Sequence, residues 1–312
     1  METSHKCIRC FFRQAETTSS LIKLAPHKKR KLHSLLKKKL LQFDPRQPPV
    51  VFGRTIYKNI SSVSGIKDIF HKEKIRIEKH LLTYINSIEQ SLQNTKDPLY
   101  AAAKMCCSAN AIDFGAGHTP NVEMLISRMK KIQLRVNNFS EFRAALRTAK
   151  TILIIADNCG EALFDRLFIE QLLRYSPRLQ IFYATRARPI INDVLVSDAK
   201  RMGIHKIATV LSSGCDYPGI IIRHTSSRFK KIYGRADIII SKGQGNFESL
   251  YDPLKNIFYL FKIKCKTVSE YLSLPASSVL FLHNRSVAYP ASYTRHTSHT
   301  SLPNRNRNEK LL

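Results

Sequence analysis

The apolar residues of the first hundred positions recur at helical spacing. Residues 1–25 place their apolar side chains on one helical face, and Pro26 ends that pattern. Further helices are predicted over residues 27–43, 50–63, 68–93 and 99–110. Segments containing proline separate several of these helices, because proline is excluded from a helix interior. The N-terminal part of the chain is therefore predicted to be entirely helical.

The pattern changes near residue 150, where short apolar runs alternate with amphipathic segments. The runs are Ile152–Ala156, Ile181–Ala184, Ile207–Leu211 and Ile238–Ile240. They follow one another at intervals of roughly 25 residues, which suits strand–helix–strand units around a buried parallel sheet. Residues 257–263 and 279–282 are expected to add further strands.

These patterns predict an α/β fold in which a helical N-terminal region packs on a Rossmann-like parallel-sheet domain. The length of 312 residues suits about two domains. We place the helical subdomain at 1–110 and the α/β domain at 111–282. The segment 283–312 lacks apolar periodicity and is rich in polar and basic residues, so it is expected to be a disordered tail.

The chain is strongly basic, with 51 Lys and Arg against 23 Asp and Glu, a formal net charge of +28. Such a charge favours contact with phosphate groups. The stretch Lys28–Lys39 is especially rich in cations. It is either a non-specific nucleic-acid patch or the solvated face of a core helix, and the leucine spacing within it favours the helix.

Neither a membrane span nor an export signal is expected. No run of about 18 apolar residues occurs, and the N-terminal segment lacks the apolar core of a signal peptide. The seven cysteines are scattered and odd in number, which fits a reducing cytoplasm better than a disulfide framework. Cys7 and Cys10 can be a buried structural pair, a redox pair or half of a zinc site.

Polar turns containing glycine or proline follow all four apolar runs. They span residues 157–161, 185–193, 212–216 and 241–246. Because the carboxyl ends of parallel strands meet at one edge of a sheet, these turns are predicted to form a binding site there. An ordinary helix cap is the alternative role of an Asp at such a position.

The residue types at this edge indicate a metal and a phosphate. The carboxylates of Asp157 and Asp193 and the amide of Asn158 are oxygen ligands, which suit Mg²⁺ or Mn²⁺ better than Zn²⁺. Co²⁺ and Ni²⁺ also accept such ligands. Lys242 stands beside Gly243, where the backbone can approach an anion closely. A metal and a fixed cation together are suited to phosphoryl chemistry.

Several motifs occur in a fixed order along residues 5–282. They are Lys6–Cys10 with Gln14, Asp97–Leu99, Asn110–Gly115, Asp157–Glu161 with Asp165, Arg186 with Pro189–Asp193, Gly214–Gly219 and Ser241–Glu248. The ordered set resembles the damage-control phosphatases, also called domain-of-unknown-function family 89, and most of all their prokaryotic branch. Cys159 departs from the usual Ala of this family, and Ala187-Arg188 departs from a usual Gly-Gly.

The resemblance implies a divalent metal, Mn or Mg above all, held by Asp157, Asn158 and Asp193. It implies that Lys242 contacts substrate phosphate and that Glu161 acts as a base or supports the metal ligands. Residues expected to bind substrate are Asn110, Asp113, Arg186, Arg188, Ser212, Asp216, Gly243 and Asn246. The implied activity is hydrolysis of small phosphate monoesters, either sugar phosphates or damaged metabolites, by direct water attack or through a phospho-enzyme.

A second hypothesis belongs to another functional class. The basic N-terminal helices would bind nucleic acid, and the α/β domain would be a degenerate scaffold. The two hypotheses differ in the residues that matter, since an enzyme depends on Asp157 and a nucleic-acid binder depends on Lys28–Lys39. The presence of the whole polar set at the strand ends favours the enzyme.

Overall fold

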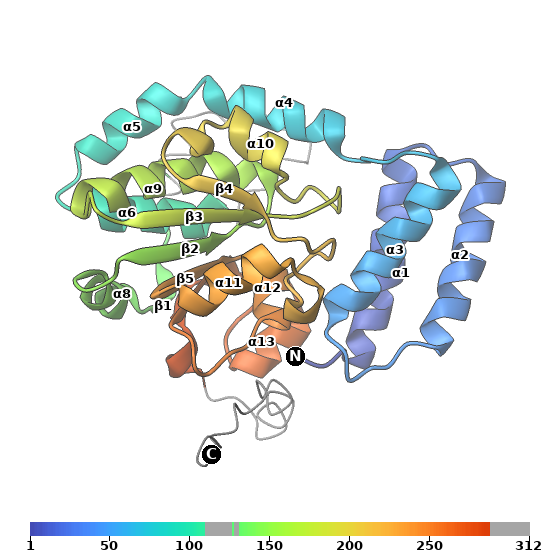
Figure 1. Cartoon of the computed structure of the whole chain (residues 1–312). Helices are drawn as coiled ribbons and strands as arrows, with labels where there is room; N and C mark the ends of the chain where they lie inside the picture. The colour runs from blue at the N-terminus through green and yellow to red at the C-terminus, as the bar shows by residue number, and fades with distance from the viewer. Residues whose placement is uncertain (110–126, 128–130, 288–312) are drawn as a thin grey trace, which may run out of the picture.

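The computed structural model describes residues 1–109, 127 and 131–287. A seven-stranded sheet lies between two layers of helices, and three further helices stand at one edge of the sheet (Figure 1). This arrangement confirms the α/β fold with helices at the N-terminus. Asn110 and Asp113, and the tail from residue 288, lie outside the described residues.

The three helices at the edge of the sheet are α1 (His5–Leu21), α2 (Pro26–Leu41) and α3 (Pro49–Ser64). Ser4 caps α1, because its hydroxyl accepts a hydrogen bond from the backbone of Lys6 at 3.2 Å. Proline stands at the first position of both α2 and α3, where no backbone donor is needed. The helices share a small apolar core built around residues such as Phe11, Leu32 and Phe52. We refer to α1, α2 and α3 as the helical layer.

The next helices lie along the sheet instead of joining the helical layer (Figure 1). They are α4 (His71–Leu82), α5 (Ile85–Gln93) and α6 (Pro98–Ala109). The single helix predicted over residues 68–93 is therefore divided in two. Its first part ends where the hydroxyl of Thr83 bonds to the carbonyl of His80 at 2.7 Å, which competes with helical hydrogen bonding.

The sheet has the strand order β1-β7-β6-β5-β2-β3-β4. Its strands are β1 (Leu134–Asn137), β2 (Thr151–Ile155), β3 (Gln180–Thr185), β4 (Thr209–Ser212), β5 (Ile238–Lys242), β6 (Ile257–Lys262) and β7 (Val279–His283). All neighbouring strands are parallel except β6 and β7. Six of these strands overlap a predicted run. The exception is β1, a four-residue strand with alternating exposure, which carries too few apolar residues to stand out.

The side chains of alternate residues in the central strands point to opposite faces of the sheet, and each face is covered by helices. The side chains of Ile152 and Ile154 pack toward α6, α8 (Phe139–Leu146) and α9 (Ala162–Tyr175). Those of Leu153 and Ile155 belong to the other core, with α11 (Ser227–Arg235), α12 (Gln244–Ser249) and α13 (Lys266–Leu272). One further helix, α10 (Val196–Arg201), follows the loop after β3. Both faces of the sheet are thus buried, as its continuous apolar runs predict.

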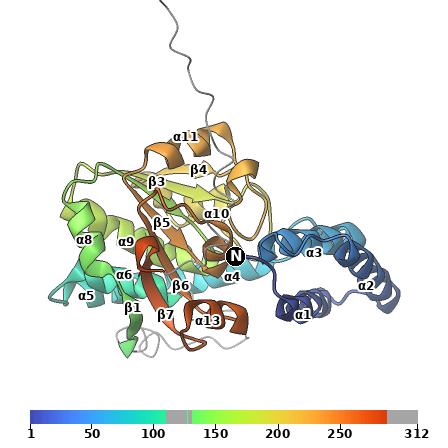
Figure 2. The same cartoon turned by 90° about the horizontal axis from the view of Figure 1, so that it is seen from below.

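The parallel strands β4-β3-β2-β5-β6 lie in the order typical of doubly wound sheets. In this order β2 and β5 are neighbours, and the connections that follow them lead to opposite sides. The loops after β2 and β5 therefore part from each other and leave a crevice at the carboxyl edge. The helical layer stands to one side of the sheet at this edge, as the view from below makes clear (Figure 2). No helix within the described ranges combines the length and the apolar character that crossing a membrane requires.

Phe142 provides a test of this packing. Its side chain is fully buried, and its ring contacts those of Phe168, Phe258 and Phe281. We expect Phe142→Ala to lower the free energy of unfolding by about 3–5 kcal/mol, because it leaves a cavity in the core. Phe142→Leu should cost clearly less. Urea unfolding followed by circular dichroism measures both, and equal losses in the two variants would contradict this account.

Candidate active site

Asp157 and Asp193 are brought together by the backbone at the carboxyl edge of the sheet. Asp157 directly follows Ala156 at the end of β2, and Asp193 lies in the loop between β3 and α10. The carbonyl of Asp157 accepts a hydrogen bond from the amide of Val194 at 2.8 Å, and Asn158 and Asp193 form an isolated β-bridge. Two loops that are distant in sequence are thereby fixed side by side, as the sequence predicted for these two carboxylates.

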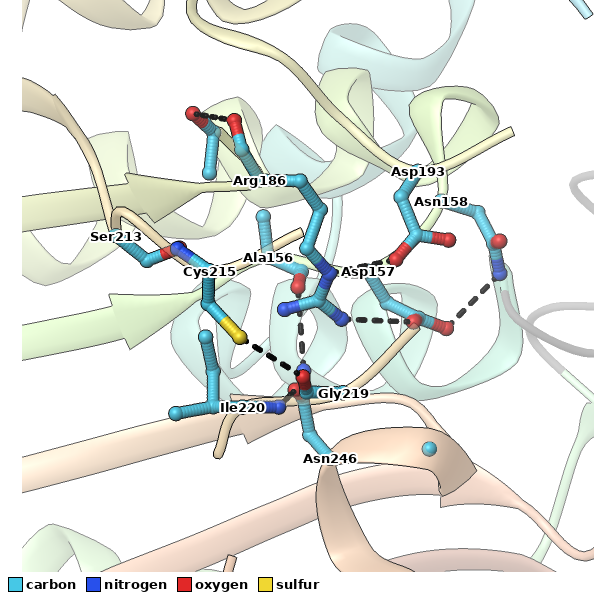
Figure 3. A network of polar contacts seen from close by, with 12 residues as sticks. Ala156, Asp157, Asn158, Arg186, Asp193, Ser213, Cys215, Gly219, Ile220 and Asn246 are labelled. Atoms are coloured by element: carbon cyan, nitrogen blue, oxygen red, sulfur yellow. Dashed lines mark hydrogen bonds and ion pairs between the residues drawn. The ribbon is translucent and has the colours of Figure 1, made fainter. Parts of the chain in front are cut away.

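Arg186 lies between the two carboxylates and is buried (Figure 3). Its Nε donates to Asp193 Oδ2 at 2.6 Å, and its Nη2 is 3.7 Å from Asp157 Oδ1. Burial opposes the charge of the guanidinium, but the two carboxylates raise the pKa of Arg186 above its ordinary value. Arg186 thus contacts both Asp157 and Asp193 and helps to orient their carboxylates. Its predicted binding of substrate stays a prediction.

Asn158 connects these aspartates to a deeper carboxylate. Its Nδ2 donates to Asp157 Oδ2 at 2.9 Å and to Glu161 Oε1 at 2.8 Å. The amide oxygen of Asn158 accepts no hydrogen bond from the described residues, so this oxygen is available to a cation. Glu161 itself is almost fully buried. Its contacts suit a residue that holds Asn158 in place.

Lys242 is completely buried, and its ammonium group contacts carboxylates. Its Nζ lies 2.8 Å from Glu161 Oε2 and 2.6 Å from Asp165 Oδ1. Asp165 also accepts hydrogen bonds from Tyr183 Oη at 2.7 Å and from Cys106 Sγ at 2.9 Å. Lys242 therefore fixes the positions of Glu161 and Asp165 through its ion pairs. It is not among the residues that line the cavity described below. Its contact with substrate phosphate stays a prediction.

The buried charges of this region do not balance. Among the described residues, one contact network joins the carboxylates Asp157, Glu161, Asp165 and Asp193 to the cations Arg186 and Lys242. Four negative charges against two positive ones leave two negative charges, which one divalent cation would neutralise. Burial, together with the charges of Asp193 and Glu161, raises the pKa of Asp157 to about 7. The oxygen donors and the uncompensated charge both fit a bound divalent metal.

Gly243 allows the carboxylate of Asp157 to approach the turn after β5. Its φ is +80°, and a Cβ atom at this position would lie 2.0 Å from Asp157 Oδ2. Asn246 ties the same turn to its neighbours (Figure 3). Its Nδ2 donates to the carbonyls of Lys242 at 2.6 Å and Ala156 at 3.2 Å, and its Oδ1 accepts from the amide of Ile220 at 2.9 Å. Both residues were predicted to bind substrate, and the structure shows them shaping the site.

The other predicted substrate residues lie apart from Asp157. Asp216 is held by Arg54, with distances of 2.6 and 2.8 Å from Nε and Nη2, and Ser212 Oγ accepts from the amide of Gly214 at 3.2 Å. Arg188 and Asp216 line a neighbouring cavity of about 370 Å³ between α3 and the loop after β3.

Asp157, Asn158 and Asp193 line a cavity of about 650 Å³. Its other walls come from α1, α3, α12 and the loop between β6 and α13. The basic residues of its lining are Lys6, Arg9, Arg13, Lys264 and Lys266. Lys264 is not among the predicted site residues, although it follows a predicted strand, as the other strand-end residues do. The metal ligands predicted from the sequence thus face a basic cavity large enough for a small metabolite.

The loop that carries Asp193 is anchored in the helical layer. Ile190 is buried in the core of that layer, together with residues such as Phe52 and Ile56. Ile191 has a φ of +46°, which a β-branched side chain rarely adopts, and it lines both cavities. Such strain costs about 1–3 kcal/mol and persists where the surroundings fix the backbone. Packing against the helical layer therefore helps to set the position of Asp193.

Glu78, Cys159 and Asp198 form a second buried group beneath α4. Their ligand atoms lie within 4.8 Å of one another, so the spacing alone would allow a metal ion. Cys159 Sγ donates to Glu78 Oε1 at 2.7 Å, Arg201 Nε lies 2.7 Å from Glu78 Oε2, and Lys74 Nζ lies 3.1 Å from Asp198 Oδ2. The protein's own cations already neutralise both carboxylates. The excess of negative charge is therefore larger around Asp157 than around Glu78 and Asp198.

The turn at Gly243 gives a direct test of the metal site. We expect Gly243→Ala to displace the Asp157 carboxylate and to weaken Mn²⁺ binding at least tenfold in a calorimetric titration. Gly234→Ala is the matched control, because no atom lies within 4 Å of the Cβ position there. It should leave Mn²⁺ binding unchanged and stabilise α11 by up to about 1 kcal/mol. Unchanged Mn²⁺ affinity in Gly243→Ala would refute the proposed close packing.

Glu248, on the cavity wall, predicts a pH effect on stability. Burial raises its pKa from 4.5 to about 7. A carboxyl group with a raised pKa in the folded state loses its stabilising contribution as the pH rises through that value. We expect Glu248→Gln to match the wild type at pH 4.5 and to exceed its stability by roughly 2–3 kcal/mol above pH 7. Urea unfolding across this range measures the difference, and a constant difference would contradict it.

Comparisons with known proteins show the family of this chain. The family model for the damage-control phosphatase ARMT1-like domain matches residues 3–278. A damage-control phosphatase of Pyrococcus horikoshii is 30% identical over 291 residues, which cover 91% of this chain and 99% of the relative. A damage-control phosphatase of Archaeoglobus fulgidus is 29% identical, over 69% of this chain and 75% of the relative.

The fold agrees as well. The crystal structure of a DUF89 family protein from Pyrococcus horikoshii superposes with a TM-score of 0.85 and 29% identity, covering 91% of this chain and 99% of that structure. The chain therefore belongs to the damage-control phosphatase family with an ARMT1-like domain, the DUF89 family.

Proposed function

We propose that this protein is a divalent-metal-dependent phosphatase that hydrolyses phosphate monoesters of small metabolites. Membership of the damage-control phosphatase family supports a phosphatase with a role in metabolite repair. The observation that carries the metal dependence is the excess of buried carboxylates over buried cations among the described residues of the network that includes Asp157, Asn158 and Asp193. The cavity that these residues line is concave and basic, which suits a small phosphorylated substrate.

In this proposal Asp157, Asn158 and Asp193 hold the metal, Mg²⁺ or Mn²⁺ above all. The bound metal would supply positive charge to the phosphoryl oxygens and to the attacking oxygen. Arg186 keeps the two aspartates in position through its contacts with both. Glu161 fixes the amide of Asn158, and Lys242 in turn fixes Glu161. These residues provide a preorganised site, so the rate enhancement comes from fixed charges that need no rearrangement.

Hydrolysis of p-nitrophenyl phosphate tests the proposal. Chelator-treated protein should be inactive, and added Mg²⁺, Mn²⁺, Co²⁺ or Ni²⁺ should restore hydrolysis, with Zn²⁺ included for comparison. Asp157→Asn should lower kcat at least 100-fold, because it removes a metal ligand. The matched control is Asp44→Asn, a substitution in the loop between α2 and α3, and it should keep wild-type activity.

Two outcomes would contradict the proposal. One is a folded wild-type protein that hydrolyses no phosphate ester with any of these metals. The other is an Asp157→Asn variant as active as the wild type. Nucleic-acid binding through α2 predicts a different pattern, namely steep salt dependence and sensitivity to charge removal within Lys28–Lys39. A binding assay with labelled DNA and RNA at several salt concentrations distinguishes this hypothesis from the enzyme.

A further inference from the structure

The basic residues that line the cavity come from α1 and from the segment that follows β6. Lys6, Arg9 and Arg13 belong to the first three turns of α1, whereas Lys264 and Lys266 belong to the loop between β6 and α13 and the start of α13. The aspartates, in contrast, come from the loops after β2 and β3. One cavity therefore joins a metal site to a separate group of cations.

Only some of these cations are neutralised by the protein. Lys6 Nζ is 2.5 Å from Glu270 Oε2, and Lys266 Nζ is 3.9 Å from Glu270 Oε1. Arg9 and Lys264 form no ion pair or side-chain hydrogen bond with any described residue, and both are exposed. The charges of Arg9 and Lys264 thus face the cavity without an ion-pair partner among the described residues, which is the arrangement of a site for an anion. Arg13 also forms no ion pair with a described residue, and its Nη2 contacts Cys10 Sγ at 4.0 Å.

The backbone of Lys264 is fixed beside the metal site. Its amide donates to Gln244 Oε1 at 2.7 Å, and Gln244 immediately follows Gly243, against which Asp157 packs. Gln244 Nε2 also bonds to Cys265 Sγ at 3.4 Å. The charge of Lys264 acts on both aspartates, since it lowers the pKa of Asp157 and of Asp193 against the effect of burial. Lys264 is therefore close to the metal site but not part of its ion pairs.

The metal site would neutralise the single phosphoryl group of a simple monoester. The additional charges of Arg9 and Lys264 would then have no partner in the complex. A cavity of about 650 Å³ has room for a sugar-sized ligand that reaches from the aspartates to these cations. A second acidic group on the ligand would take the place that no protein carboxylate fills.

We propose that Arg9 and Lys264 form a second anion site, and that the substrate carries a second acidic group, a phosphate or a carboxylate, besides the phosphoryl group that is cleaved. The inference rests on the proposed phosphatase function, because the ligand occupies the same cavity. It adds a substrate class to that function, namely phosphate esters with two acidic groups.

Three matched sugar phosphates test the inference. Glucose 6-phosphate has one acidic group, glucose 1,6-bisphosphate adds a phosphate, and 6-phosphogluconate adds a carboxylate. We expect kcat/KM to be at least tenfold higher for one of the doubly acidic esters than for glucose 6-phosphate. The ester that gains identifies the second group. The preference should shrink as NaCl is added, since the charges of Arg9 and Lys264 are exposed to solvent.

The variants Arg9→Gln and Lys264→Gln should reduce this preference to less than threefold. Lys38→Gln removes an exposed charge from α2, away from the cavity, and should keep both the preference and the rate. Three results would overturn the inference: a wild-type preference below twofold, a preference that survives both substitutions, or an equal loss in Lys38→Gln.

Binding without turnover separates this inference from the proposed function. In the Asp157→Asn background, calorimetry should show at least tenfold tighter binding of a doubly acidic ester than of glucose 6-phosphate, and Lys264→Gln should remove the difference. Equal affinities would refute the second anion site even in an active phosphatase. Conversely, a wild-type protein without phosphatase activity that keeps the affinity difference would refute the proposed function and leave the anion site in place.

Discussion

Arg186 holds two buried carboxylates with a single positive charge, and the site depends on this imbalance. Burying a carboxylate is costly unless a cation or hydrogen bonds compensate for the lost water. The backbone bridge between Asn158 and Asp193 prevents the two aspartates from separating to relieve their repulsion. The protein therefore keeps a negative group in place at the cost of stability. A divalent cation is the ligand that would remove this cost.

The cations of the protein fall into two classes with different roles. Lys242 and Arg186 are buried and engaged with carboxylates, so they fix geometry and their charge is little affected by salt. Arg9 and Lys264 are exposed and have no partner among the described residues, so they can attract and release an anion. A site that must bind an anion and let the product leave benefits from keeping these roles on separate residues.

The strands and the closeness of Asp157 and Asp193 follow from simple rules of the sequence, whereas their role as metal ligands stays a prediction. A short apolar run with turns on both sides predicts a buried strand, and parallel strands end at one edge. The rules do not say which way a turn residue points. The side chains of Lys242, Arg186 and Asn246 contact the protein, and their contact with substrate stays a prediction. The predicted site omits Lys264 because it includes only the turns after the first four apolar runs, and Lys264 follows a later run. The division between α4 and α5 coincides with backbone and hydroxyl hydrogen bonds of Thr83 to the carbonyl of His80, which leave no mark in the apolar spacing.

The anchoring of Ile190 in the core of the helical layer has a consequence for selectivity. The same layer supplies the α1 wall of the cavity and supports the loop that carries Asp193. The cavity wall formed by α1 and the carboxylate that we propose as a metal ligand are thus supported by the same core. A ligand that displaces the wall also displaces Asp193, so a poorly fitting molecule would disturb the chemistry as well as bind weakly.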